Sequence, residues 1–562
     1  MKTLGKNIFA IGVSLCIFTF FLLNSCNNNS SKKLLDNTHD LSSLREIEIL
    51  NKSQTHDNPR MRYKVLSSKF INGSDKWSIL ITQLEGFSED DYQSAYSLIY
   101  NKDIPTIQNH ITNGLLTYET LSKWYLYRIY KYESKPSTTL NSIISIIPDA
   151  VTQAKEKDRL KESNHPIYGM PILLKDNINA EGAPTTAGAI ALSNNIVKDA
   201  TIVKNLKSKG AIILGKVNLS EWAYYFCDGC PLGYSAIGGQ SLNPYGRMIF
   251  ETGGSSAASG TSMAANYAAG AVGTETAGSI LSPSSQNSVV GLKPTVGVLS
   301  RTGIIPISST LDTPGPMTRS AIDNSILLSA MYGADNEDKT TTPAPRQNDF
   351  IEKTTSTLDK NDIVLAANKN YIQTDSLYRS TVEKLRNKGI KIIEFDPSEV
   401  DFSGFTTVLD YDMKVDLPHY LANYGGSNLP VSSVTQVIAY NLEDSTIRIP
   451  YGQKLFQGSA ENQTPESEMN DIKQRLENDM RKHFDTVFKL DQVDAILSIN
   501  NYDAARAAMA KYPCLAMPMG YNKNSEPKSM TFIGKRFSEA SLLQLGHWFE
   551  QNVFTRSSPK GY

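Results

Sequence analysis

Residues 253–279 read GGSSAASGTSMAANYAAGAVGTETAGS, and this run of small residues is the most informative stretch of the chain. Two glycines precede Ser255 and Ser256, and Gly278 precedes Ser279. Glycine is used where the backbone turns tightly or approaches a ligand closely, so the pattern predicts serine hydroxyls presented on exposed, constrained turns. These serines are the candidate nucleophiles.

A serine hydroxyl needs a base to become a good nucleophile at neutral pH, and histidine is the usual partner. The chain has seven histidines, and none lies within residues 253–279. The Gly-x-Ser-x-Gly elbow is also missing around Ser255 and Ser279. A Ser-His-Asp triad is therefore disfavoured.

A lysine is the alternative base. The apolar run Pro171–Leu174 leads directly into Lys175, which is typical of a buried strand whose end delivers an amine to the interior. Lowering a lysine pKa from about 10.4 to about 7 costs roughly 4 to 5 kcal/mol and requires a dry, preformed pocket. On these residues alone, a strand-end lysine that reaches solvent stays an open alternative.

Several segments together resemble the amidase signature hydrolases in order and spacing; they are residues 169–177, 185–188, 210–221, 253–279 and 291–295. The resemblance implies an α/β fold with a mixed central β-sheet covered by helices. It also implies a catalytic triad of Lys175, Ser255 as the cis serine, and Ser279 as the nucleophile. No cofactor and no metal are expected.

The same resemblance assigns the oxyanion hole and its surroundings. The backbone N–H groups of Thr276, Ala277, Gly278 and Ser279 are expected to form the hole, and a cis peptide bond is expected between Gly254 and Ser255. Gly254 and Ser256 are expected to support the triad, Ser256 as a hydrogen-bonding partner, although Ser256 could also be a simple loop serine.

Within the family the chain most resembles the peptide amidase branch. Leu281 stands where the family commonly has an arginine, Glu275 where it has an aspartate, and Ala277 where it has a glycine. These departures leave the triad intact but weaken any substrate assignment taken from fatty-acid-amide or transamidosome relatives. The expected reaction is hydrolysis of a carboxamide C–N bond through an acyl-enzyme, giving a carboxylate plus ammonia or an amine. C-terminal peptide amides are one candidate substrate class.

Two functions other than amide hydrolysis are also considered for this sequence. The first is a catalytically inactive surface binding lipoprotein on an amidase scaffold, which the complete set of Lys175, Ser255 and Ser279 disfavours. The second is a transamidosome subunit, which an export signal disfavours because its tRNA partner is cytosolic. The net charge of −1 and the pI of about 6.7 also provide no basic footprint for nucleic acid. Small-molecule or peptide amides are the expected partners, without an obligate protein partner.

The N-terminus predicts export. Lys2 and Lys6 precede an apolar stretch over residues 8–23, and Leu23-Asn24-Ser25-Cys26 resembles a bacterial lipobox. We expect residues 1–25 to be a signal peptide and Cys26 to be lipidated, which would anchor the protein to a bacterial membrane on its periplasmic or cell-surface side. A plain signal peptide or a single membrane anchor is the alternative.

The remaining chain is divided by composition. We expect residues 26–90 to be a tether and N-terminal extension, and residues 91–562 to be the amidase signature domain, with a variable substrate-entrance region over residues 335–490. Within the extension, the basic and aromatic cluster at residues 60–64 predicts a solvated surface. Residues 402–470 are expected to be irregular. A β-α-β unit is expected over residues 363–394.

Two motifs invite other functions. Residues 210–217 nearly spell a phosphate-binding loop, but Val217 replaces the Ser or Thr that would bind magnesium, so a buried strand is expected. Cys227 and Cys230 could be half of a zinc site, yet too few further cysteines remain in the mature chain. For an exported protein we predict that these two cysteines form a disulfide.

Overall fold

The computed structural model describes residues 46–70, 76–160, 162, 164–341 and 349–562. Contacts divide the chain into two units, Met1–Asp57 and Asn58–Tyr562. In the first unit, residues 46–53 form a helix. The predicted signal peptide, lipobox and tether lie outside the described residues. No helix in the described ranges is long and apolar enough to cross a membrane.

The second unit contains the expected amidase signature domain together with the part of the expected extension that begins at Asn58. Its first elements are η1 (Pro59–Met61), α2 (Lys76–Gln83) and α3 (Glu89–Ile99). Met61, Tyr63 and Tyr92 are buried, because this segment packs onto the rest of the unit.

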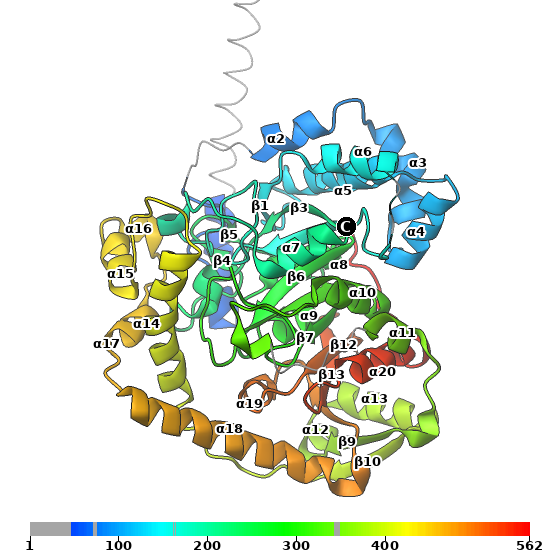
Figure 1. Cartoon of the computed structure of the whole chain (residues 1–562), viewed down its shortest axis with the longest axis vertical. Helices are drawn as coiled ribbons and strands as arrows, with labels where there is room; N and C mark the ends of the chain where they lie inside the picture. The colour runs from blue at the N-terminus through cyan, green and yellow to red at the C-terminus, as the bar shows by residue number, and fades with distance from the viewer. Residues whose placement is uncertain (1–45, 71–75, 161, 163, 342–348) are drawn as a thin grey trace, which may run out of the picture. The chain divides into compact units, whose positions relative to one another are not determined.

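A mixed eleven-stranded sheet forms the centre of this unit, with the strand order β1-β3-β2-β6-β8-β7-β12-β13-β11-β9-β10 (Figure 1). The strands are β1 (Ile143–Ile146), β2 (Pro171–Lys175), β3 (Ile212–Val217), β6 (Gly270–Glu275), β7 (Val290–Lys293), β8 (Thr313–Thr318), β9 (Val364–Asn368), β10 (Lys391–Phe395), β11 (Ala495–Ile499), β12 (Cys514–Tyr521) and β13 (Pro527–Gly534). A separate hairpin pairs β4 (Tyr234–Ser235) with β5 (Gly239–Gln240).

Helices cover the sheet, as the α/β prediction requires. The helices of this unit include α4 (Ile104–Thr112), α5 (Tyr118–Glu133), α6 (Ala150–Leu160), α7 (Thr201–Ser208), α8 (Ala257–Ala264), α9 (Leu281–Gln286), α10 (Ala321–Met331), α11 (Phe350–Thr355), α19 (Ala504–Met509) and α20 (Glu539–Asn552). Helices α10, α11 and α20 pack on one another, and α8 packs on β6. The predicted fold class is confirmed.

The pairing of β2 positions the candidate base. Strand β2 lies between two parallel neighbours, β3 and β6, and every residue of β2 is buried. Leu174 pairs with Val272, so Lys175 at the end of β2 comes level with the last residues of β6. Parallel strands end at the same edge of a sheet, and this edge therefore brings Lys175 close to Thr274. The near phosphate-binding loop is strand β3, as expected.

The β-α-β unit is confirmed, whereas the region after it differs from the prediction. Strands β9 and β10 are parallel, with α12 (Lys369–Thr374) and α13 (Ser376–Asn387) between them. Residues 402–470 are mostly helical rather than irregular. They contain α14 (Phe405–Asn423), α15 (Val434–Leu442), α16 (Ser445–Arg448), α17 (Lys454–Glu461) and the start of α18 (Glu466–Phe488).

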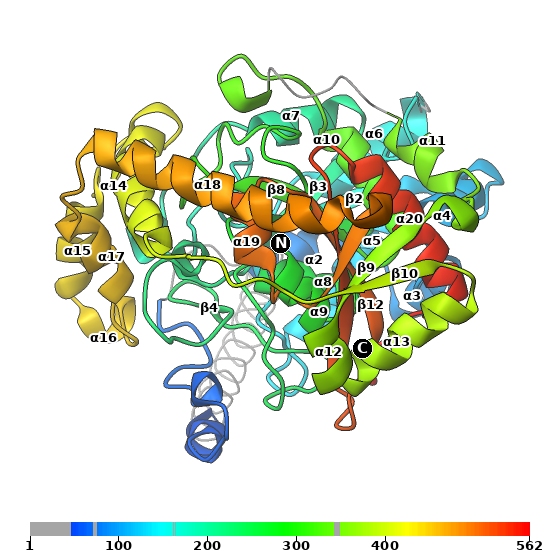
Figure 2. The ribbon, with the colours of Figure 1, turned by 90° about the horizontal axis from the view of Figure 1, so that it is seen from below.

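The helices of residues 402–470 are hard to predict from the sequence for a physical reason. Pro418 lies inside α14, and the apolar side chains of this helix are not gathered on one face, so the usual helical pattern is weak. The helices are instead stabilised by tertiary contacts, with Met413, Tyr420 and Phe456 buried in a shared core. Both views show α14 to α17 as a group beside the sheet, joined to the β9–β10 end by α18 (Figures 1 and 2).

Candidate active site

Lys175 is fully buried at the end of β2, so it does not reach solvent. Its Nζ lies 2.8 Å from Ser255 Oγ and 2.8 Å from Thr274 Oγ1. The Thr274 carbonyl oxygen is 3.2 Å from the same nitrogen. The amine is thus surrounded by three neutral oxygens, and within the described residues it makes no ion pair with a carboxylate.

Burial lowers the pKa of Lys175 to about 7, because the charged form loses its hydration. The negative charges of Asp312 and Glu275 act in the opposite direction, but their effect on this pKa is smaller than that of burial. A large fraction of the amine is therefore uncharged at neutral pH. An uncharged amine has a lone pair and can accept a proton from a hydroxyl.

Ser255 and Ser256 are fully buried, which corrects the expectation of exposed turns. A cis peptide bond joins Gly254 to Ser255, as the family resemblance implied. The glycines allow close packing: a Cβ added to Gly253 would lie 2.7 Å from the backbone of Pro283. Ser256 acts as the expected hydrogen-bonding partner, since its Oγ donates to the Thr274 carbonyl over 3.0 Å.

Ser279 is partly buried and lines a cavity of about 440 Å³ together with Gly253, Gly254, Ala277 and Gly278. The backbone N–H of Ser256 donates to the Ser279 carbonyl over 3.1 Å, which fixes the two serine segments side by side. Among the described residues, no hydrogen bond joins the Ser255 and Ser279 hydroxyls. The structure thus brings Lys175 and Ser255 into contact. The second contact of the predicted triad, between the Ser255 and Ser279 hydroxyls, is not formed among the described residues.

The predicted oxyanion loop has free donors. In the described part of the chain, the N–H groups of Thr276, Ala277 and Ser279 donate to no other group. The loop is held from behind by Glu275, whose carboxylate accepts the N–H groups of Ile280 over 2.6 Å and Leu281 over 2.9 Å. The donors at the start of the loop are therefore available to a ligand in the Ser279 cavity.

Comparisons with known proteins show the family of the chain. A family profile described as Amidase matches residues 124–501. A probable amidase of Arabidopsis thaliana is 34% identical over 502 residues, which cover 86% of this chain and 95% of that protein. The chain belongs to the amidase signature family. It is accordingly an amidase of the hydrolase class.

Solved structures of the family show the same fold. An amidase family protein from Bacillus anthracis has a TM-score of 0.83 and 34% identity, and the match covers 88% of this amidase and 99% of that chain. The native peptide amidase from Stenotrophomonas maltophilia has a TM-score of 0.76 and 32% identity, covering 82% of this amidase and 98% of that chain. Peptide amidases are thus among its structural neighbours.

Four residues of the site were not singled out from the sequence. Thr274 binds the Lys175 amine, and Asn177 donates from its Nδ2 to Thr274 Oγ1 over 3.0 Å. Asp312 is one of the groups that raise the pKa of Lys175. Arg60 lines the Ser279 cavity, with its Nε 3.1 Å from Glu251 Oε1. Only strand register and chain folding, which the sequence does not reveal directly, bring these residues to the site.

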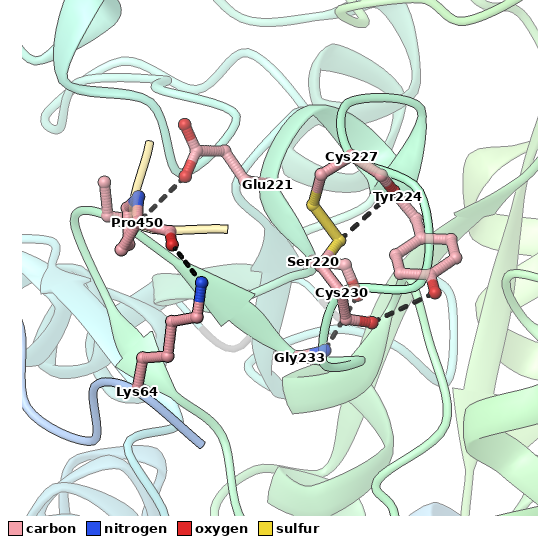
Figure 3. Close-up of a disulfide and its surroundings, with 9 residues drawn as sticks. Lys64, Ser220, Glu221, Tyr224, Cys227, Cys230, Gly233 and Pro450 are labelled. Carbon is pink, nitrogen blue, oxygen red and sulfur yellow. Dashed lines mark hydrogen bonds between the residues drawn. A yellow bond between two sulfur atoms is a disulfide. The ribbon is translucent and has the colours of Figure 1, made fainter. Parts of the chain in front are cut away.

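Arg60 also corrects the prediction for residues 60–64. Met61 and Tyr63 are buried, and Lys64 Nζ donates to the Pro450 carbonyl over 2.9 Å (Figure 3). Met61 and Tyr63 therefore pack against the rest of the unit and Arg60 lines the cavity, whereas Arg62 and Lys64 are exposed as predicted. The signal that could have indicated this is the aromatic content of the cluster, because aromatic residues bury a large apolar area.

The loop that forms one wall of the Ser279 cavity contains a disulfide. Cys227 and Cys230 are bonded, as predicted, and Tyr224 Oη donates to the Cys230 carbonyl over 3.0 Å (Figure 3). At the base of the loop, Gly233 N donates to Ser220 Oγ over 2.8 Å, and Ser220 N donates to the Ser255 carbonyl. Within the described residues, no three or more His, Cys, Asp or Glu side chains are arranged so that they could hold a metal ion.

Glu275 provides the first test. Replacing Glu275 by alanine removes the acceptor of two buried N–H groups behind Ser279, so the oxyanion loop loses its support. We expect kcat for a hydrolysed amide to fall by about a hundredfold, the size of a lost oxyanion donor, with a smaller change in KM. Glu275→Gln is the matched control because its amide oxygen can still accept, and it should retain much more activity. An unchanged kcat in Glu275→Ala would refute this role.

Proposed function

We propose that this amidase is a serine amidohydrolase in which Lys175, Ser255 and Ser279 act as a catalytic triad. The observation that carries the proposal is the 2.8 Å contact between Ser255 Oγ and the fully buried Lys175 Nζ. A buried amine of lowered pKa next to a serine hydroxyl is a suitable base. Its position also fits the need for a dry site, where proton transfer is not disturbed by water.

Proton movement follows from the contacts. In its uncharged form, Lys175 has two N–H donors for the Thr274 carbonyl and hydroxyl oxygens, which leaves its lone pair for the Ser255 hydroxyl. Ser255 then accepts the proton of Ser279 as Ser279 Oγ attacks the carboxamide carbon. The missing Ser255–Ser279 hydrogen bond is expected to form with substrate, because catalytic hydrogen bonds often tighten only in the complex.

The tetrahedral intermediate carries a negative oxygen, which the free N–H groups of Thr276, Ala277 and Ser279 would stabilise; the N–H of Gly278, the fourth predicted donor, bonds to the Glu275 carboxylate. Each such donor is worth about a hundredfold or more in rate. Ser255 next gives its proton to the leaving nitrogen, so that ammonia or an amine departs and the acyl group stays on Ser279. Water, deprotonated through the same Ser255 and Lys175, attacks the acyl-enzyme and releases the carboxylate.

C-terminal peptide amides are the proposed substrates. The similarity to the peptide amidase from Stenotrophomonas maltophilia supports this choice. A cavity of about 440 Å³ in front of Ser279 is also larger than a simple carboxamide requires and falls within the range of small-molecule sites. For its location, we propose that Cys26 is lipidated and holds the amidase at a bacterial membrane outside the cytoplasm.

Loss of the triad gives a direct test. We expect Ser279→Ala and Lys175→Ala to abolish ammonia release from amidated peptides while the melting temperature shows a folded protein. Lys204→Ala is the matched lysine control, because Lys204 is exposed on α7. A serine-directed phosphonate probe should label Ser279 in the parent protein. Parent-like activity in either triad variant, or no labelling at Ser279, would favour the inactive binding protein.

The dependence of activity on pH follows from Lys175. Because burial lowers the pKa of Lys175 to about 7, kcat/KM should fall as acid protonates the amine and should rise to a plateau above neutrality. Asp312 raises this pKa by favouring the charged amine. Asp312→Asn should therefore move the inflection to lower pH. A rate that does not change through this range would speak against Lys175 as the base.

A further inference from the structure

A second cavity, of about 190 Å³, borders the same site. Thr274 and Thr276 at the end of β6 line it, next to Ala277 of the Ser279 cavity. Ala223 lines this second cavity, and the following residue, Tyr224, lines the Ser279 cavity. The linings of the two cavities are therefore adjacent along the chain at two pairs of consecutive residues, Ala223 and Tyr224, and Thr276 and Ala277.

The second cavity carries an excess of negative charge. One guanidinium and four carboxylates line it; they are Arg301, Asp312, Glu337, Asp338 and Asp416. Arg301 is paired with Asp338, which lines the same cavity. Its Nε and one Nη donate to Asp338 over 2.9 Å and 2.8 Å. Among the described residues, Asp312, Glu337 and Asp416 form no ion pair, although the charge of Arg301 also acts on Asp312 and Asp416.

Asp312 and Asp416 are held by neutral donors only. Asp312 accepts the N–H groups of Ile307 and Ser308 over 2.8 Å and 2.9 Å, and Asp416 accepts the N–H of Ser309 over 2.6 Å. Burial raises the pKa of both groups, to about 7 for Asp416, where the charge of Asp412 adds to the effect. A cationic ligand would stabilise the charged forms of these two poorly hydrated carboxylates, which line one cavity.

Asn177 points to a ligand independently of these acids. It lines the cavity and is 2% exposed. Its Nδ2 donates to Thr274 Oγ1 over 3.0 Å and to the Ile305 carbonyl over 3.2 Å, while its Oδ1 is buried and has no hydrogen-bond partner in the part of the chain that the structure describes. An unpaired buried acceptor is costly, and a ligand that donates hydrogen bonds would satisfy it.

One part of the wall is apolar, with Ile304, Ile305, Pro306 and Ile307 in sequence, beside polar lining residues that include Ser308, Ser309 and His419. We propose that this cavity binds a protonated amine on a short alkyl chain, so that the preferred amides carry an ammonium group close to the scissile carboxamide. Asp312 and Asp416 take the ammonium, Asn177 Oδ1 accepts one of its hydrogens, and the isoleucines pack on the methylenes. This inference names the substrate class of the site and rests on the proposed function.

Matched substrates test the charge alone. 6-Aminohexanamide and heptanamide differ by an ammonium in place of a methyl group, as do 4-aminobutanamide and pentanamide at shorter reach. We expect kcat/KM to favour the amino amide in at least one pair by about tenfold, as for a partly buried charge pair. Asp416→Asn should reduce that ratio to near one. Asp471→Asn, which removes an exposed carboxylate of α18, should leave the ratio unchanged.

A binding experiment separates this inference from the proposed reaction. Titration calorimetry of Ser279→Ala with hexylamine should show binding that Asp416→Asn weakens and Asp471→Asn does not, and hexan-1-ol should bind more weakly. Equal kcat/KM within both substrate pairs, or hexylamine binding that Asp416→Asn does not weaken, would overturn the inference. If no amide were hydrolysed at all, the proposed function would fail, and the calorimetry would still decide whether the cavity takes an ammonium.

Discussion

The contact between the Lys175 amine and the Ser255 hydroxyl is the interaction on which the rest of the site depends. It requires an amine kept out of water, since a hydrated lysine stays charged at neutral pH and cannot accept a proton. Full burial at the end of β2 meets this requirement. The cost is several kcal/mol, which a large and well-packed sheet can carry.

The scaffold explains how the amine stays dry and in place. Two parallel neighbours cover β2 along its length, and the end of β6 supplies both oxygens of Thr274 to the lysine. The serines come from a different part of the chain, on a loop whose glycines allow backbone contact with Pro283. The segment that carries Ser279, the proposed nucleophile, is in turn held by Glu275 and by the Ser256 contact to the Ser279 carbonyl.

Much of this arrangement could be predicted from the sequence, because the relevant signals are local. The apolar run before Lys175 indicated a buried strand, and the family resemblance named the triad and the fold. Residues 402–470 could not be predicted in the same way, since the α14 to α18 helices depend on tertiary packing and α14 contains Pro418. Thr274, Asn177 and Arg60 were missed because strand register and long-range folding place them. The prediction that Ser255 lies on an exposed turn was wrong because its burial also depends on long-range folding.

The titration of Lys175 itself tests the central claim most directly. Lysine labelled with ¹³C at the ε carbon can be followed by NMR as the pH is varied, with Lys175→Met used to assign the signal. The structure predicts a pKa of about 7 for this amine. A value near 10.4, as for an ordinary exposed lysine, would mean that Lys175 is charged at neutral pH and would contradict its role as the base.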